Sequence, residues 1–218
     1  MLVDIVVFDG LDELDALGPL EVWRKAQSAH GNFEVRLVSA TGQKTVRGAG
    51  GLDFSTDGTF DPTEAEILLV PGGGWNARAE VGAWGEHQRG ELEPLLAVAA
   101  AHVGVLAGVC TGTMLLAHAG LIPGRRASTH HSALAELAAL GVEVVAERVV
   151  DDGNLVTCGG VTSGIDLALW LVARELGEDL AERIAVTIEY SWFRPSPPSP
   201  EGGASPFGGG VELVGRET

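Results

Sequence analysis

Short apolar segments alternate with longer amphipathic segments along most of the chain. Segments typical of buried strands occur at Leu2–Phe8, Phe33–Ser39, Ile67–Val70 and Val103–Ala107. Helical spacing of apolar positions predicts helices at Pro19–Ala29, Glu91–His102, Thr113–Ala119, Ser132–Leu140, Thr162–Leu176 and Asp179–Tyr190. Glycine-rich Thr45–Thr56 is predicted to form a small hairpin or an irregular excursion, and Arg148–Val150 with Leu155–Thr157 a β-hairpin.

The order of these elements predicts an α/β fold. Strands that alternate with helices pair in parallel through right-handed crossovers, which places helices on both faces of one open, mostly parallel sheet. The runs Ile67–Val70 and Val103–Ala107 are apolar at every position or nearly so, with no polar alternation. We therefore expect them to be central strands that are buried on both faces.

Composition changes near residue 190. Arg194–Gly210 contains five prolines and five glycines in seventeen positions, too few apolar groups to form a core. We therefore expect one α/β domain over residues 1–190 and a loose Pro/Gly-rich tail over residues 191–218.

Charge and termini narrow the classes of partner. The formal net charge of the 218-residue chain is −16, which a phosphate backbone would repel, so nucleic acid is not an expected partner. No run has the length of a membrane span, and the N-terminus lacks the basic region of a signal peptide. A cytoplasmic protein without membrane contact is expected. The pair His130-His131 is a weak metal signal, and loop histidines are the simpler interpretation.

The sequence around Cys110 carries the clearest chemical signal. A predicted strand runs into Gly108-Val109-Cys110-Thr111-Gly112 and then directly into a helix, which is the pattern of a nucleophile elbow with cysteine as the nucleophile. A sulfur at a helix N-terminus is expected to have a lowered pKa. Most single cysteines are packing residues, but this context favours a reactive one. Cys158 lacks such a context and is interpreted as a small residue near the end of a strand.

A second loop is expected at the same edge of the sheet. Pro71-Gly72-Gly73-Gly74 follows the strand Ile67–Val70, and ligands bind at this edge in open α/β sheets. The N–H groups of Gly73 and Gly74 are candidates to form an oxyanion hole with the N–H of Thr111. A plain turn is the alternative.

Asp15 is the candidate proton carrier. Its apolar neighbours Leu14 and Leu17 are expected to hold it near the edge of the core, where burial and a nearby thiolate would raise the pKa of its carboxyl. The alternative is a helix N-cap, a role for which Asp12 also qualifies. Glu21 ranks below Asp15 because it is expected to face solvent on the helix.

Together these motifs resemble the ThiJ/PfpI family of the glutamine-amidotransferase-like superfamily, over roughly Val3–Tyr190. The resemblance also includes Ala119–His130, Asp152–Thr157 and Gly159–Asp166. It implies a flavodoxin-like sheet, a homodimer that acts on a small molecule, and no metal or organic cofactor.

The pattern is most similar to the isocyanide-hydrating members of that family and to the N-terminal domains of related transcriptional regulators. This implies a cysteine-dependent hydro-lyase that converts isocyanides to N-substituted formamides. Cys110 would attack the isocyanide carbon, Asp15 would move protons and direct water, and Thr111 would contribute its N–H and hydroxyl. Protease-like members carry His after the cysteine, so Thr111 argues against proteolysis. The regulators continue into a helix-turn-helix domain where this sequence has its Pro/Gly-rich stretch, so a complete transcription factor is not expected.

Two other functions use the same cysteine. A glyoxalase- or deglycase-like enzyme acting on methylglyoxal would use His130 as a general acid or base. In a non-catalytic redox-sensing or chaperone-like protein, Cys110 would be oxidised to the sulfinate and no substrate would be turned over. Relatives with these functions mostly carry Glu where this sequence has Asp15, which favours the hydratase.

Overall fold

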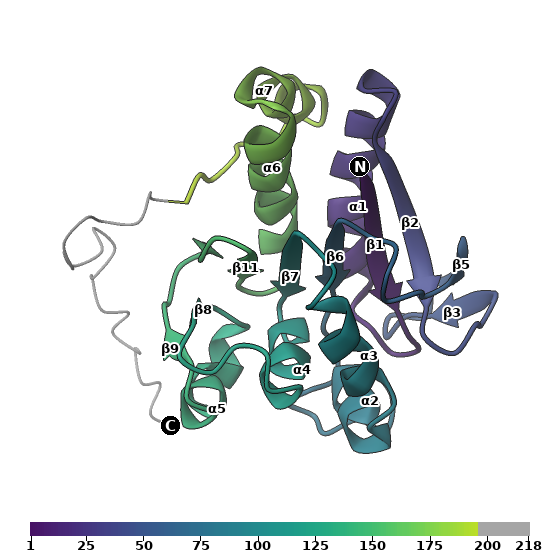
Figure 1. Ribbon diagram of the computed structural model, residues 1–218, viewed down its shortest axis with the longest axis vertical. Helices are drawn as coiled ribbons and strands as arrows, with labels where there is room; N and C mark the ends of the chain where they lie inside the picture. Colours follow the sequence, from purple (N-terminus) through teal and green to yellow (C-terminus); the bar gives the residue numbers. More distant parts are fainter. Residues whose placement is uncertain (196–218) are drawn as a thin grey trace, which may run out of the picture.

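The computed structural model describes residues 1–195, and the predicted tail lies outside the described residues from residue 196 onward (Figure 1). Its centre is a seven-stranded sheet in the order β10-β11-β7-β6-β1-β2-β5. The strands of this sheet are β1 (Leu2–Val7), β2 (Glu34–Ser39), β5 (Gly58–Thr59), β6 (Ile67–Val70), β7 (Val105–Val109), β10 (Val149–Asp151) and β11 (Leu155–Cys158). The described strands of this sheet pair in parallel except β10, which runs antiparallel to β11.

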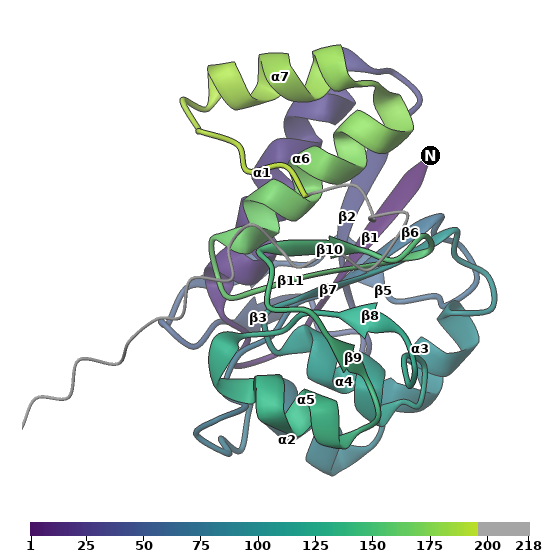
Figure 2. The ribbon, with the colours of Figure 1, turned by 90° about the vertical axis from the view of Figure 1, so that its left-hand side faces the viewer.

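Helices cover both faces of this sheet, as the sequence predicted. The helices are α1 (Glu13–Ala29), α2 (Ala83–Arg89), α3 (Leu92–Ala99), α4 (Gly112–His118), α5 (Leu134–Ala139), α6 (Ser163–Leu176) and α7 (Glu178–Thr187), with a short 3-10 helix at His131–Ala133. Helices α1, α6 and α7 pack together on one face, and α2, α3 and α4 pack on the other (Figure 2). Every residue of β6 and β7 is buried, which confirms that they are central strands.

The smaller elements only partly follow the prediction. The segment at Thr45–Thr56 does form a hairpin, from β3 (Thr45–Arg47) and β4 (Asp53–Ser55). Two short strands that the sequence did not predict, β8 (Arg126–Ala127) and β9 (Glu143–Val144), pair in parallel. Helix α2 was also missed. No helix of the described chain is both long and apolar enough to cross a membrane.

The start of α1 corrects one prediction. Pro19 was expected in the first turn, but the helix begins six residues earlier, at Glu13, so that Pro19 lies inside it. Asp12 supplies the N-cap, because its carboxylate accepts a hydrogen bond from the N–H of Leu14 at 3.3 Å. Proline has no N–H to donate to the carbonyl of Asp15 one turn earlier. The packing of α1 against α6 holds the helix together across this missing bond.

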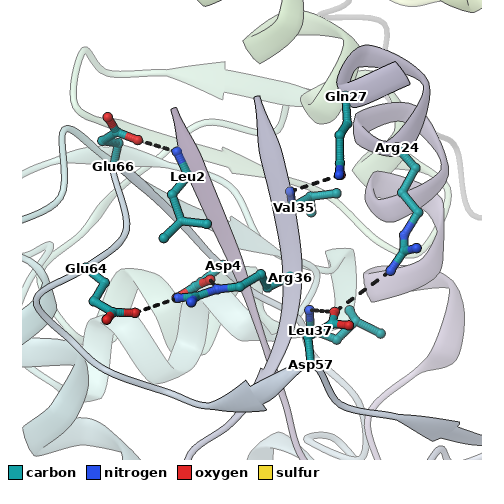
Figure 3. Close-up of polar contacts among 10 residues, drawn as sticks. All are labelled: Leu2, Asp4, Arg24, Gln27, Val35, Arg36, Leu37, Asp57, Glu64 and Glu66. Atoms are coloured by element: carbon teal, nitrogen blue, oxygen red, sulfur yellow. Dashed lines mark hydrogen bonds and ion pairs between the residues drawn. The ribbon is translucent and has the colours of Figure 1, made fainter. Parts of the chain in front are cut away.

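A buried ion pair joins β1 to β2 (Figure 3). Asp4 is fully buried, and its two carboxylate oxygens accept bonds from Nε and Nη2 of Arg36 at 2.8 and 2.9 Å. Nη2 also donates to Glu64 at 3.0 Å. The fork geometry of this arginine satisfies a carboxylate that water cannot reach.

Replacing Arg36 with methionine is expected to lower the free energy of unfolding by about 3 kcal/mol or more, because the Asp4 charge is then buried without a partner. Urea denaturation measures this loss. Arg24→Met is the matched control, since the Arg24–Asp57 pair is 3.8 Å long and about half exposed (Figure 3). Its loss is expected to cost under about 1 kcal/mol. Equal losses in the two variants would contradict this account of Asp4.

Candidate active site

The nucleophile-elbow geometry is present at Cys110. Strand β7 ends at Val109, α4 begins at Gly112, and Cys110 between them has a φ of +54°, in the left-handed region. A side chain at Gly112 would collide with the carbonyl oxygen of Val70, and one at Gly108 would meet Thr113. The two glycines of the motif are therefore required by the close approach of neighbouring backbone and side chains. Cys110 is 6% exposed.

Asp15 lies in the first turn of α1, directly behind the cysteine. It is fully buried, and Oδ2 accepts a hydrogen bond from the N–H of Gly72 at 3.0 Å. Oδ1 has no well-aligned hydrogen-bond partner among the described residues, and the carboxyl interacts instead with the Cys110 thiol. Since Asp12 caps the helix, Asp15 is not needed as a cap. Glu21 is exposed and pairs with Lys25 at 3.0 Å.

The pKa of Asp15 is raised to about 8, mainly because the carboxyl is buried and secondly by the charge of Asp12. The predicted rise in the Asp15 pKa is therefore confirmed. The negative charge of a Cys110 thiolate, which was expected to contribute to this rise, is not among its causes. A buried carboxyl that keeps its proton near neutral pH is suited to give and take that proton at the adjacent sulfur. Because Oδ2 is engaged with Gly72, the proton belongs on Oδ1, which faces no other partner.

The predicted lowering of the Cys110 pKa was wrong. Burial and the neighbouring Asp15 raise the pKa of the thiol to about 12, and the N–H groups of Thr111 and Val161 only partly oppose this. The helix N-terminus is present, but its effect is smaller than the cost of placing a charge in a buried site beside a carboxylate. The two groups therefore titrate as a pair, which loses its first proton near pH 8.

The glycine loop and the elbow follow the neighbouring parallel strands β6 and β7, so they lie at the same edge of the sheet, as predicted. The N–H of Gly73 donates to Oγ1 of Thr111 at 3.0 Å, so this amide orients Thr111. The N–H of Thr111 in turn interacts with the Cys110 sulfur. Gly74 lies beside Gly73 in the lining of the adjoining pocket.

Two residues that the sequence did not single out also hold the cysteine. The N–H of Val161 interacts with the sulfur, and Val161 adopts a φ of +42°, unusual for a β-branched residue. Oγ1 of Thr129 donates to the carbonyl of Cys110 at 2.8 Å. The paired glycines before Val161 are a local sequence signal for such a turn.

The sulfur opens into a pocket of about 250 Å³. Its lining comprises Asp12, Gly73, Gly74, Trp75, Asn76, Ala77, Cys110, Thr111, His130 and Val161. His130 therefore shares the pocket with the thiol, and its ring packs closely against Gly160 while Nδ1 bonds to Ser132. Burial and the neighbouring His131 lower the pKa of His130, which favours its neutral form.

Cys158 ends β11 and is fully buried, in agreement with its interpretation as a packing residue. Within residues 1–195, no three His, Cys, Asp or Glu side chains are grouped closely enough to hold a metal ion. The pocket lining includes the Cys110 thiol, the His130 imidazole and several backbone N–H groups, and the buried Asp15 carboxyl lies next to the thiol.

Known proteins resemble this chain in sequence and in architecture. The sequence model of the DJ-1/PfpI family matches residues 1–174. Isonitrile hydratase of Pseudomonas putida is 33% identical over 201 residues, which make up 92% of this chain and 82% of that protein. The HTH-type transcriptional regulator CdhR of Pseudomonas aeruginosa is 29% identical over 87% of this chain and 55% of the regulator.

A solved structure agrees with these matches. The crystal structure of a ThiJ/PfpI family protein from Pseudomonas syringae superposes with a TM-score of 0.78 at 27% identity, and covers 93% of this chain and 78% of that one. The flavodoxin-like sheet with helices on both faces is the fold of these neighbours. The chain therefore belongs to the DJ-1/PfpI family.

Proposed function

We propose that this protein hydrates isocyanides to N-substituted formamides, with Cys110 as the nucleophile and Asp15 as the proton carrier. One observation carries the proposal: a fully buried carboxyl that has a raised pKa and an oxygen with no other partner interacts with the thiol at the base of a pocket. The 33% identity to an isonitrile hydratase over 92% of the chain supports the same reaction.

In the first step, Sγ of Cys110 attacks the terminal carbon of the isocyanide. In the form of the pair that has lost its first proton, the Asp15 carboxylate takes the thiol proton and returns it to that carbon, so that a thioimidate, Cys110–S–CH=N–R, forms without net uptake of a proton. The N–H groups of Thr111 and Val161, which interact with the sulfur, stabilise the negative charge that appears there when the thiol loses its proton, before the S–C bond forms.

In the second step, water adds to the thioimidate carbon. Asp15 accepts a proton from the water, the C–S bond breaks, and the thiol and the nitrogen each end with a proton, which yields R–NH–CHO. The N–H groups of Thr111, Gly73 and Gly74 are proposed to bind the oxygen of the tetrahedral intermediate. Gly74 is the stronger candidate of the loop, since Gly73 already donates to Thr111.

The pocket bears on the class of substrate. A volume of about 250 Å³ suits a small ligand, and its lining includes Trp75 and Ala77 beside the backbone of the glycine loop. We therefore propose small alkyl or aryl isocyanides. The homodimer, the cytoplasmic location and the independence from metals and cofactors that the resemblance implies stay predictions.

Incubation of the purified protein with a simple alkyl isocyanide is expected to yield the N-formyl amine, detected by mass spectrometry. Protein alkylated beforehand with iodoacetamide is expected to yield none. If folded, unmodified protein forms no N-formyl product, the hydratase proposal fails. Lactate formed from methylglyoxal would then favour the glyoxalase-like function and His130, and selective sulfinate at Cys110 without turnover would favour redox sensing.

A further inference from the structure

The turn that carries the Val161 amide needs external support. Val161 is β-branched and has a φ of +42°, a conformation that persists only where surrounding groups fix it. It lies between the glycine pair at Gly159-Gly160 and the first residue of α6, Ser163. The groups that fix this turn therefore also fix the position of the Val161 N–H at the Cys110 sulfur.

Arg148 contacts both ends of the turn. Its backbone carbonyl accepts the N–H of Gly159 at 3.0 Å, and its Nη2 donates to Oγ1 of Thr162 at 3.0 Å. The carbonyl of Gly159 then accepts the N–H of Cys110 at 3.1 Å. Hydrogen bonds thus link Arg148 to Gly159 and Thr162, which flank the turn, and link Gly159 to Cys110 in the elbow.

The guanidinium of Arg148 makes further hydrogen bonds that fix its orientation. Nε donates to the carboxylate of Asp166, which is fully buried, and Nη2 donates to the hydroxyl of Tyr190 at 2.9 Å. The Tyr190 hydroxyl in turn donates to Asp166 at 2.9 Å. The N–H of Phe193 donates to the other oxygen of Asp166 at 2.8 Å. The segment after α7 therefore completes the group of contacts that aims Arg148 at Thr162.

We propose that Arg148 is a positioning residue, which acts through Thr162 to hold the Val161 amide against the Cys110 sulfur and so favours the thiolate. The inference rests on the proposed role of Cys110 as a nucleophile, but not on the identity of its substrate. Thr162 is the informative position: its side chain is exposed and makes no N-cap hydrogen bond to α6. Its bond to Arg148 can therefore be removed with little other disturbance.

Thr162→Val is expected to slow the alkylation of Cys110 by iodoacetamide at pH 8 by roughly three- to tenfold, since a less stable thiolate is less abundant. Thr162→Ser, which keeps the hydroxyl, is expected to restore the wild-type rate. A merely structural role would give the opposite sign, because loosening the site would expose the buried sulfur and speed alkylation. An unchanged or faster rate in Thr162→Val would overturn the proposal.

Arg148→Lys keeps the charge but loses the planar fork, in which Nε donates to Asp166 and Nη2 to Thr162 and Tyr190, and is expected to slow alkylation to a similar extent. The matched control is Arg174→Met. Arg174 lies on α6, is also partly buried, and pairs with Asp151 of β10 at 3.0 Å. This variant is expected to react at the wild-type rate, and equal slowing in both arginine variants would also overturn the proposal. Because no isocyanide is used, failure here is separate from failure of the hydratase assay.

Discussion

Cys110→Ala is expected to form no N-formyl product above the uncatalysed rate, even though its fold is retained. In the proposed mechanism the thiol forms the only covalent bond to the substrate, and no other side chain in the pocket lining is a comparable nucleophile. Mass spectrometry of the product, at protein concentrations high enough to detect about a 10⁴-fold slower rate, measures the effect.

The second cysteine provides the matched control for this variant. Cys158 is fully buried in β11 and does not line the pocket, so Cys158→Ala is expected to keep its activity and to lose about 1–2 kcal/mol of stability. Product formation that survives in Cys110→Ala, or that disappears in folded Cys158→Ala, would show that the wrong sulfur has been assigned.

Asp15→Asn is expected to lower kcat by roughly 10²–10⁴-fold, the usual contribution of a general acid or base. The amide oxygen still accepts the N–H of Gly72, but the side chain no longer carries a proton to and from the sulfur. In the wild type, kcat/KM is expected to rise with pH through an ionisation near 8, where the pair becomes a monoanion. A wild-type pH profile in the variant would remove Asp15 from the mechanism.

The same variant is expected to be more stable than the wild type above neutral pH. The pKa of Asp15 in the folded protein, about 8, lies above its ordinary value of 3.8, so the folded state binds this proton more tightly than the unfolded chain does. That stabilisation is complete below pH 4 and is lost as the pH rises through 8. Urea denaturation at pH 8 is therefore expected to show a gain of roughly 2–5 kcal/mol in Asp15→Asn, which shrinks towards pH 4.

If Asp15→Asn is less active and yet more stable, its loss of activity comes from the loss of proton transfer and not from general damage to the site. If Asp15→Asn is destabilised at pH 8, the burial of an ionised carboxylate cannot be the reason for the raised pKa. A stability difference that does not change with pH would lead to the same conclusion.

Patterns that depend on neighbours in the sequence predicted much of this fold. The apolar runs at β6 and β7 are buried on both faces, and the glycines around Cys110 are required by packing at the elbow. Helix α2 was missed because its seven residues, with four polar side chains and a glycine among them, show no clear apolar periodicity. The start of α1 was misplaced because Pro19 was given more weight than the Asp12 cap.

The sequence predicted which residues form the candidate site, but it did not predict the pKa of the Cys110 thiol. The sequence pattern predicts a helix that begins just after Cys110, and the N–H of Thr111 was therefore expected near the sulfur. The sequence does not reveal how deeply a side chain is buried. Burial is nevertheless the largest cause of the raised pKa values of Cys110 and Asp15. The contribution of Val161 depends on a positive φ, which sequence propensity disfavours for valine.

The two edge strands of the main sheet limit how two copies of this protein can associate. Strand β10 has three residues and β5 has two, so each open edge offers only a few unpaired backbone groups to another chain. Short outer strands are a common protection against strand addition and fibril growth. Any association between two copies is therefore expected to bury helix surfaces rather than to extend one sheet across both molecules.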